Sequence, residues 1–395
     1  MTLLEPTSEP EVVAHVAAAR QDRRTLSLRG GGTQVGLGRP VAADVILSCR
    51  ALTGITLHEP AELVIAAWAG TPVAEVEAAL ASTGQILPFE PVDLRPLYGT
   101  AGAPTLGGVV AGNWSGPRRI QAGAARDHLI GVRFVNGRGE AIKSGGRVMK
   151  NVTGLDLVKL QCGAQGTLGV LTEVTFKVLP RPESTLTLAF AGLDDRRAVA
   201  LLTAALGSPY EVSGAAHLPP GVEGAGARTL LRLEGFAASI AYRADQLATL
   251  LHRYGGPAMI EGDAAAALWA AVRDGRLLAE PRDRAVWRIS VPPTQGPTLV
   301  DALRGRLAFA HLYDWGGGLI WLATAVERDA GATAIRDALA LIGGHATLLR
   351  APDAVRTRVP VFQPLAAPLA AVVARVKASL DPDLILNRGF MVAEG

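Results

Sequence analysis

Apolar runs that end at glycine alternate with helical patterns in the first part of the chain. Two such runs, residues 26–28 and 63–69, are typical of strands followed by tight turns. Thr71 is a predicted helix N-cap and Pro72 the predicted first helical residue. The apolar positions that follow at helical spacing are Val73, Val76 and Leu80. The pattern predicts strands joined to helices through glycine turns.

A hairpin and a proline-rich boundary come next. The Asn-Gly pair at 136–137 divides residues 129–142 into two short runs, as in a β-hairpin. Residues 166–179 again have the pattern of a turn followed by a strand. Pro180 and Pro182 fit neither a central strand nor a helix interior. We therefore expect a first domain at residues 1–180.

After this boundary the order becomes strand, helix, strand, strand, helix, strand, and a similar order recurs after Val286. The predicted strands are 186–190, 230–233, 286–291 and 319–322, and the predicted helices are 196–206, 240–251, 299–307 and 334–342. This order predicts an α+β fold, in which a cap at residues 183–350 has an antiparallel sheet of two ferredoxin-like halves with helices on one face. A C-terminal segment, 351–395, contains a predicted helix at 367–380.

Composition narrows the class of protein. The 395 residues are 49% apolar, which favours two domains, and 39 basic against 36 acidic residues are mixed along the chain, which argues against nucleic acid as a partner. Cys49 and Cys162 are too few for an iron–sulfur cluster or a disulfide framework, which favours the cytoplasm. No histidine pair has metal-ligand spacing, so no metal is expected. Prolines interrupt the uncharged stretch 359–374, so we expect no membrane span. Residues 1–11 carry acids and prolines where an export signal needs a basic start and an apolar run, so we expect no export.

Three glycine clusters are the candidate binding loops. The first, residues 29–34, has three consecutive glycines whose amides can point into one concavity and bind phosphate. It is not a Walker loop, and Val35 stands where a dinucleotide fingerprint needs a small residue. The second and third clusters are residues 105–113 and 163–172. Taken alone, the first cluster is more typical of a plain surface turn, and tight packing is the alternative for the other two.

These clusters, with several further stretches, resemble the FAD-binding domain of the vanillyl-alcohol oxidase and p-cresol methylhydroxylase (PCMH) superfamily. The further stretches are residues 87–91, 115–119, 125–127, 145–157, 178–182, 313–317, 343–347 and 380–382. Within that superfamily, the stretch 145–157 in particular resembles the FAD-binding E subunits of bacterial glycolate oxidases, as do residues 87–91, 115–119, 125–127 and 178–182. The resemblance implies a PCMH-type FAD-binding domain of two α+β subdomains, followed by the cap.

The resemblance also implies which residues bind FAD. They are Arg29, Gly30, Gly31, Gly32, Thr33, Gln34, Pro88, Thr105, Gly107, Gly108, Ala111, Gly112, Gly116, Gly166, Thr167, Gly169 and Val170. In many relatives a histidine beside the first glycine loop is bonded covalently to the flavin. Thr33 takes that place here, and its hydroxyl cannot form that bond. We therefore expect non-covalent FAD.

Candidates for catalysis are few. His345 follows two glycines in a predicted turn, and Arg118 could hold a carboxylate; a structural histidine and a solvated arginine are the alternatives. Trp287 and Trp315 could line a substrate pocket or pack in a core. Relatives that oxidise D-lactate or glycolate have a histidine-rich metal motif, which this sequence lacks. At residues 387–389 those relatives have Asn-Pro-Gly, and here Arg388 replaces the proline.

The resemblance implies an FAD-binding component of a glycolate oxidase or dehydrogenase complex, which converts glycolate to glyoxylate. Its expected partners are a separate catalytic FAD subunit and an iron–sulfur subunit, in the cytoplasm or peripheral to the inner membrane through those partners. Two alternatives stay open. One is a stand-alone FAD oxidase of another hydroxy acid or alcohol, and the other is an assembly scaffold without turnover.

Overall fold

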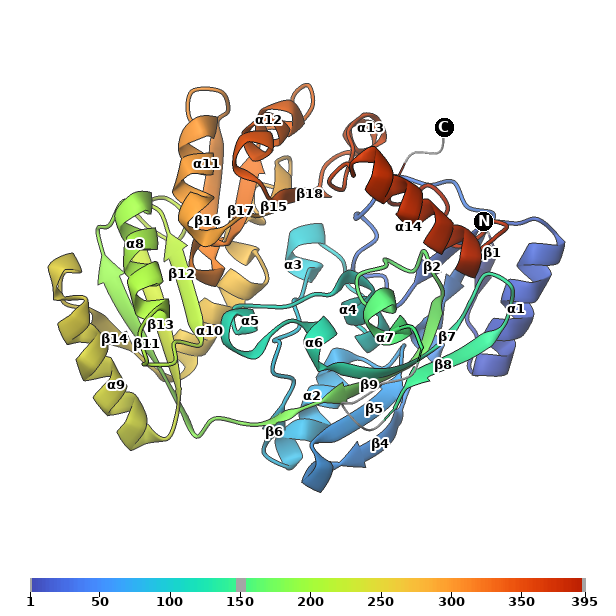
Figure 1. Ribbon diagram of the computed structural model, residues 1–395, viewed down its shortest axis with the longest axis horizontal. Helices are drawn as coiled ribbons and strands as arrows, with labels where there is room; N and C mark the ends of the chain where they lie inside the picture. Colours follow the sequence, from blue (N-terminus) through green and yellow to red (C-terminus); the bar gives the residue numbers. More distant parts are fainter. Residues whose placement is uncertain (1, 147–153, 393–395) are drawn as a thin grey trace.

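The computed structural model describes residues 2–146 and 154–392, and its strands form four sheets. Figure 1 shows the sheets of residues 2–180 on one side of the molecule and the eight-stranded sheet of the cap on the other. Most of the stretch 145–157 that carries the resemblance, residues 147–153, lies outside the described residues. The α-helices are α1 (Glu9–Gln21), α2 (Val73–Ser82), α3 (Arg95–Tyr98), α4 (Leu106–Gly112), α5 (Arg119–Ala122), α6 (Ala125–His128), α7 (Leu157–Gln161), α8 (Asp195–Leu206), α9 (Ala237–Leu250), α10 (Gly262–Arg273), α11 (Gly296–Leu303), α12 (Ala332–Ile342), α13 (Asp353–Arg358) and α14 (Ala367–Leu380).

A small parallel sheet comes first in the chain. Its strands, in spatial order, are β1 (Thr2–Leu4), β3 (Val45–Ser48) and β2 (Leu26–Arg29). Helix α1 buries Val12 and Val16 in a core shared with these strands. Ser8 caps α1 by accepting a hydrogen bond from the Glu11 amide. The end of β2 therefore delivers the first glycine loop from a fixed position.

An antiparallel sheet of five strands holds the other two glycine clusters. In spatial order its strands are β4 (Ile55–Glu59), β5 (Val64–Trp68), β9 (Val170–Lys177), β7 (Leu129–Val135) and β8 (Ala141–Gly145). The predicted hairpin at 136–137 is confirmed as the β7–β8 turn. A two-stranded sheet joins β6 (Gln85–Ile86) to β10 (Leu179–Pro180). Residues 105–113 therefore lie against the end of β5, and residues 163–169 lie against α4 and the end of β7.

The prediction that Thr71 caps the following helix is wrong. Helix α2 has Pro72 at its N-cap position, without a side-chain cap bond. The Thr71 hydroxyl instead accepts a hydrogen bond from the Gly54 amide at 3.0 Å and donates to the Gly54 carbonyl oxygen at 3.2 Å. Because the buried Thr71 hydroxyl is already hydrogen-bonded to a turn distant in sequence, it does not cap α2.

The cap is one antiparallel sheet of eight strands. In spatial order they are β14 (Ala258–Ile260), β11 (Ser184–Ala191), β13 (Arg228–Gly235), β12 (Gly214–Leu218), β16 (Phe309–Asp314), β17 (Leu319–Thr324), β15 (Ala285–Ser290) and β18 (His345–Arg350). Along the chain each half has the order β-α-β-β-α-β. The halves meet at β12 and β16, which pair only through His217 and Tyr313 among the described residues.

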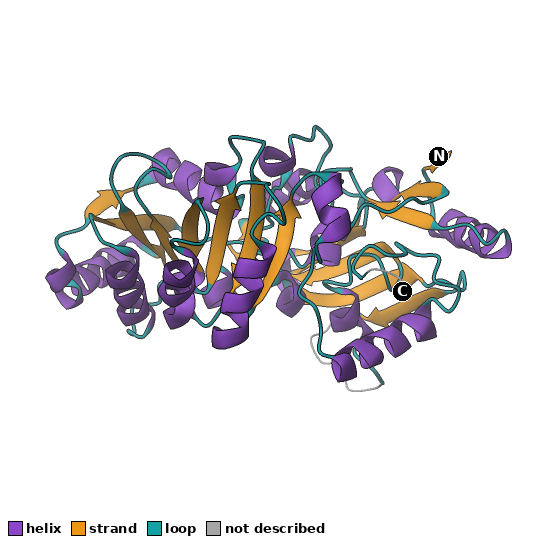
Figure 2. Cartoon of the chain, turned by 90° about the horizontal axis from the view of Figure 1, so that it is seen from above, coloured by secondary structure: helices purple, strands orange, loops and turns teal. Residues whose placement is uncertain are grey.

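The two faces of the cap sheet have different neighbours. Helices α8, α9, α11 and α12 bury one face, as the cores around Trp287 and Leu231 show. Figure 2 shows the strands of this sheet with helices packed along them. The opposite face, which carries Trp321 and Leu230, shares a core with Trp114 and other residues of the first region. Side chains on this second face therefore point toward the FAD-type region.

The C-terminal segment returns to the first region. Its helix α14 has the predicted bounds. Lys377 on α14 donates to the carbonyl oxygens of Thr167 at 2.6 Å and Leu386 at 2.8 Å. Leu386 forms a β-bridge with Leu26. Figure 1 shows α14 above β2, close to the N-terminal sheet.

Candidate functional site

A pocket lies beyond the end of β2, where the three glycine clusters meet. The predicted cofactor residues that line it are Arg29, Gly30, Gly31, Gly32, Thr33, Gln34, Thr105, Gly107, Gly108, Ala111, Gly166, Gly169 and Val170. These residues come from the loop after β2, helix α4 and the segment that leads into β9. Segments far apart in the sequence therefore form one site.

The first glycine loop touches the backbone of residues 102–103, directly before the second cluster. A Cβ atom at Gly31 would clash with the carbonyl oxygen of Ala103, and one at Gly102 would clash with the carbonyl oxygen of Gly31. A Cβ atom at Gly30 would overlap the hydroxyl of Thr105. Gly32 has a φ of +74°, in the left-handed region that favours glycine. Any side chain at Gly31 must therefore displace the loop.

Thr105 and Gly107 position the second loop. The Thr105 hydroxyl accepts a hydrogen bond from the Gly108 amide at 3.3 Å and so caps α4. Gly107 packs against Ala69 at the end of β5, where a Cβ atom would lie 2.8 Å from the Ala69 carbonyl oxygen. The glycines thus bring α4 close to β5 and leave its Gly108 and Ala111 on the pocket wall.

Asn387 ties the third loop to the first strand. Its Oδ1 accepts a hydrogen bond from the Leu28 amide at 2.7 Å, and its Nδ2 donates to the Gln165 carbonyl oxygen at 2.8 Å. Gly166, with a φ of +67°, follows directly and lies against the Asn387 amide. One side chain in the C-terminal segment therefore holds two pocket walls together.

The described lining of the pocket has more positive than negative side chains. Arg29, Arg39 and Arg356 line it, with Asp353 as the one acidic residue of the lining. The guanidinium group of Arg356 donates to the Gly38 carbonyl oxygen and to Asp353, each at 2.6 Å. A concave surface of backbone and arginines favours a phosphate-containing ligand.

Four predicted cofactor residues lie outside the lining of this pocket: Pro88, Gly112, Gly116 and Thr167. The indole ring of Trp114 occupies the space beside Gly112, and Glu90 and Arg273 pack against Gly116. The Thr167 hydroxyl donates to the Ala164 carbonyl oxygen at 2.7 Å. Pro88 is buried. These four predicted residues therefore pack within the protein and do not line the pocket.

The pocket also has lining residues that the sequence does not point to. Arg39, Arg356 and Phe390 line the pocket but belong to no recognisable sequence motif. Asn387 also lines it, at a position where relatives have a turn near the flavin. Cys49 also lines the pocket, and burial raises the pKa of its thiol to about 12. The thiol is therefore neutral at physiological pH and a poor nucleophile.

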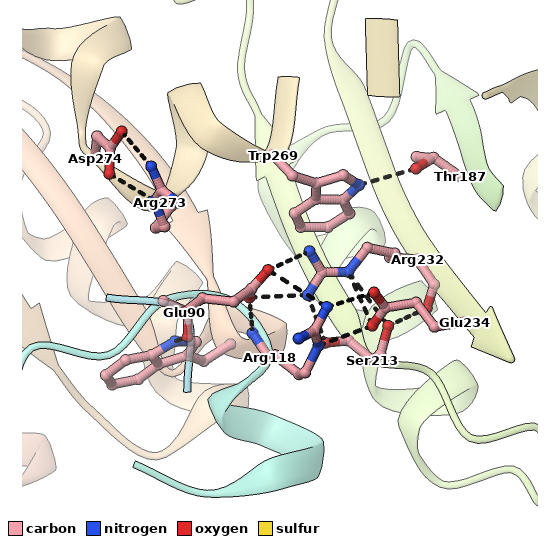
Figure 3. A network of polar contacts seen from close by, with 11 residues as sticks. Glu90, Arg118, Thr187, Ser213, Arg232, Glu234, Trp269, Arg273 and Asp274 are labelled. Atoms are coloured by element: carbon pink, nitrogen blue, oxygen red, sulfur yellow. Dashed lines mark hydrogen bonds and ion pairs between the residues drawn. The ribbon is translucent and has the colours of Figure 1, made fainter. Parts of the chain in front are cut away.

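A second polar site joins the first region to the cap (Figure 3). The Arg232 guanidinium on β13 donates to both Glu90 oxygens, at 2.8 and 2.9 Å, and Arg118 donates through Nε and Nη2 to Glu234, at 3.0 and 2.5 Å. Trp269 stacks on Arg232 at 4.8 Å. Burial would raise the pKa of Glu90, but the charges of Arg232 and Arg118 outweigh it and lower this pKa to about 2. We call these four charged residues the junction network.

The two catalytic candidates lie apart from the pocket lining. Arg118 belongs to the junction network, so carboxylates of the chain already occupy its guanidinium edge. His345 begins β18 opposite Ser290 and is exposed. Partial burial of the ring and the nearby charges of Arg288 and Arg119 lower the pKa of His345.

Two further observations concern the described part of the chain. No group of three or more His, Cys, Asp or Glu side chains there has the arrangement of a metal site. None of its helices has the length and apolar character needed to cross a membrane.

Comparisons with known proteins identify the family. Residues 2–145 match a family described as FAD binding domain. The chain is 36% identical over 389 residues to the glycolate oxidase subunit GlcE of Escherichia coli (strain K12), which covers 97% of both chains. This chain belongs to the GlcE family. The GlcE resemblance stated from the stretch 145–157 is confirmed.

Other relatives are more distant. The chain is 27% identical over 258 residues to the glycolate oxidase subunit GlcD of Bacillus subtilis (strain 168), covering 65% of this chain and 51% of that one. Among solved structures, p-cresol methylhydroxylase with substrate bound has a TM-score of 0.75 at 13% identity, covering 99% of this chain and 88% of that one. An alkyldihydroxyacetonephosphate synthase has a TM-score of 0.72 at 18% identity, covering 98% and 75%. These structures show the predicted α+β, PCMH-type fold.

Membership in this family makes the chain an FAD-dependent oxidoreductase, and the pocket fits the cofactor. Residues 30–32 of the lining carry no side chains, so the backbone amides of this loop can approach a phosphate closely. The positive side chains of Arg29, Arg39 and Arg356 in the lining suit a ligand with negatively charged phosphates. Thr33, which is buried at the end of the glycine triplet, has a hydroxyl that forms no bond to flavin carbon.

Proposed function

We propose that this chain is the FAD-carrying subunit of a complex that oxidises glycolate to glyoxylate. The full-length similarity to a glycolate oxidase subunit is the observation that supports this most strongly. The pocket of three glycine loops supports it independently, because a backbone-lined, cationic cleft suits a flavin dinucleotide.

In this proposal the chain's own residues bind and orient the cofactor. The glycine loop at 30–32, together with Arg29, holds the pyrophosphate, while Thr105, Gly108 and Ala111 form the adjoining wall. Gly166 and Val170 form the wall on the other side. When bound, FAD would supply two-electron redox chemistry, the kind that oxidation of a hydroxy acid requires.

We further propose that the chain works with a separate catalytic flavoprotein and an iron–sulfur subunit, in the cytoplasm or at the inner membrane surface through those partners. The name of the Escherichia coli relative, a subunit, supports a complex. Neither cysteine of this chain is exposed to bind a cluster: Cys49 and Cys162 are buried, and burial raises the pKa of each thiol to about 12.

The test is to purify the chain alone and with the proteins that co-purify with it, and to add glycolate without oxygen. We expect flavin absorbance in the isolated chain and glycolate-dependent bleaching that requires the other subunits. Bleaching of the isolated chain would favour the stand-alone oxidase. Full activity of a complex whose Gly31→Asp subunit lacks flavin would favour the scaffold.

A further inference from the structure

Arg288 lies on the face of the cap sheet that points toward the FAD-type region. It is in the middle of β15, opposite Trp321 on β17 and Thr347 on β18. Its neighbours Trp287 and Ile289 point the other way, into the core under α11 and α12. Because side chains alternate along a strand, the guanidinium of Arg288 is directed at the junction between the two regions.

The guanidinium group of Arg288 has two donors without an acceptor. Its Nε and Nη2 atoms are out of contact with solvent and have no hydrogen-bond partner among the described residues. Arg228 and Arg336 each have one such atom, Nε. The indole rings of Trp315 and Trp114 lie 4.8 and 5.8 Å from the Arg288 Cζ atom. They hold the cation in place but accept none of these N–H bonds.

The free edge of Arg288 is the one that binds carboxylates elsewhere in this protein. Arg118 uses Nε and Nη2 to bind both oxygens of Glu234, and Arg273 uses the same pair to bind Asp274 at 2.7 and 3.0 Å. This planar edge matches a carboxylate with two parallel bonds. A buried donor left without an acceptor has lost its hydrogen bonds to water without replacement, and an external carboxylate would remove that penalty.

The surroundings of Arg288 favour an anion. The Arg119 Cζ atom also lies over the Trp315 ring, 4.3 Å from the ring centroid. His345 lies near both arginines. Burial, followed by the charge of Arg119, lowers the pKa of Arg288 to about 10, so it stays positive at neutral pH. Asp314 is the acidic group nearby, and burial raises its pKa to about 7, which reduces its negative charge.

Arg288 is also connected to the cofactor pocket. Trp114, whose ring faces Arg288, donates from its Nε1 to the Gln34 Oε1 at 2.9 Å, and Gln34 lines the pocket. Trp315 donates from its Nε1 to the Gly116 carbonyl oxygen at 3.0 Å and so fixes the cap to the same loop. One indole ring therefore separates the free guanidinium edge from the wall of the pocket.

We propose that the Nε and Nη2 edge of Arg288 binds the carboxylate of a small hydroxy or keto acid at this junction, beside the glycine pocket. The identity of the acid rests on the proposed function, whereas the carboxylate site rests on the unpaired edge. In this proposal Arg288 is a binding residue, and this chain is the subunit of the complex that holds the acid.

The test is calorimetric titration of the FAD-loaded full chain with oxalate, which is not oxidised, and with glycolate. We expect Arg288→Met to weaken binding at least about tenfold, and Arg288→Lys, which keeps the charge but loses the paired edge, to fall between. Arg253→Met, which removes a charge from the exposed cap surface, should bind as the parent does. Because Nε and Nη2 of Arg288 have no acceptor among the described residues, we expect Arg288→Met to fold and to be at least as stable as the parent.

Unchanged oxalate binding by folded Arg288→Met, or no binding by the parent chain, would overturn this site. The flavin content of each sample is measured first. A chain that takes up no FAD but still binds oxalate through Arg288 would contradict the proposed function and leave the carboxylate site standing.

Discussion

The cofactor pocket and the junction network are built in opposite ways. The pocket is formed largely by backbone, with no room for a side chain at Gly30 or Gly31, and its loops are continuous sequence motifs. The junction network is formed by charged side chains, in which Glu90 and Arg232 are separated by 142 positions along the chain. Ligand specificity in the first depends on shape, whereas adhesion between regions in the second depends on charge pairing.

Substituting Gly31 by Asp should have the largest effect, loss of FAD binding. The new Cβ atom has no room beside the Ala103 carbonyl oxygen, and a carboxylate there would repel a pyrophosphate. We expect FAD affinity to fall by more than about a hundredfold, measured as flavin retained on gel filtration. Gly224→Asp is the control, because no atom lies within 4 Å of a Cβ there. Retained flavin in Gly31→Asp would show that the loop does not form the site.

Removing Arg232 should have the next largest effect, on stability. Arg232→Met leaves the Glu90 carboxylate without its main partner, and breaking a buried ion pair costs about 3–5 kcal/mol. Denaturant unfolding measures this. The control is Arg95→Met, which breaks an exposed pair with Asp93 and should cost less than about 1 kcal/mol. Equal losses of unfolding free energy in both variants would mean that the buried junction pair stabilises the fold no more than an exposed pair does.

The junction should also make the protein sensitive to acid. The pKa of Glu90 is lowered to about 2 from an ordinary 4.5, so its contribution is complete above pH 4.5 and is lost as the pH falls toward 2. The full contribution is on the order of 3 kcal/mol. Unfolding free energies of the parent and Glu90→Gln across this range should converge at low pH. Parallel curves would rule out Glu90 as the source.

A smaller effect is expected at Asn387, which links the pocket walls. Asn387→Ala removes the bonds to the Leu28 amide and the Gln165 carbonyl oxygen, leaving both groups without this partner. The expected cost is about 1–3 kcal/mol of stability, with a several-fold weaker affinity for FAD. Thermal unfolding with and without FAD separates the two effects. A stability loss with unchanged FAD affinity would place Asn387 in the scaffold alone.

The difference between the two regions also explains what the sequence could predict. The β7–β8 hairpin, helix α14 and the pocket glycines depend on local patterns, and the structure brings these glycines together. The junction pairs depend on which side chains tertiary packing brings into contact. Thr71 shows the same limit on a small scale, because its hydroxyl prefers a buried turn at Gly54 to the next helix.

Strands β12, β14, β16 and β18 belong to the predicted strand order of the cap, but no sequence pattern indicated their bounds. β14 is three residues long and largely exposed, and β12 is buried throughout, so neither shows the alternation that marks a strand. The sequence does not predict a binding role for Arg288, for a related reason. A single arginine in a strand pattern suggests a solvated side chain, and only the packed sheet shows that two of its donors are enclosed.

The most direct test of the account is the flavin content of the purified chain. We expect yellow protein whose FAD passes into the supernatant when acid or heat precipitates the chain, since Thr33 forms no bond to the flavin. Well-folded chain that stays colourless and shows no affinity for added FAD would contradict the account.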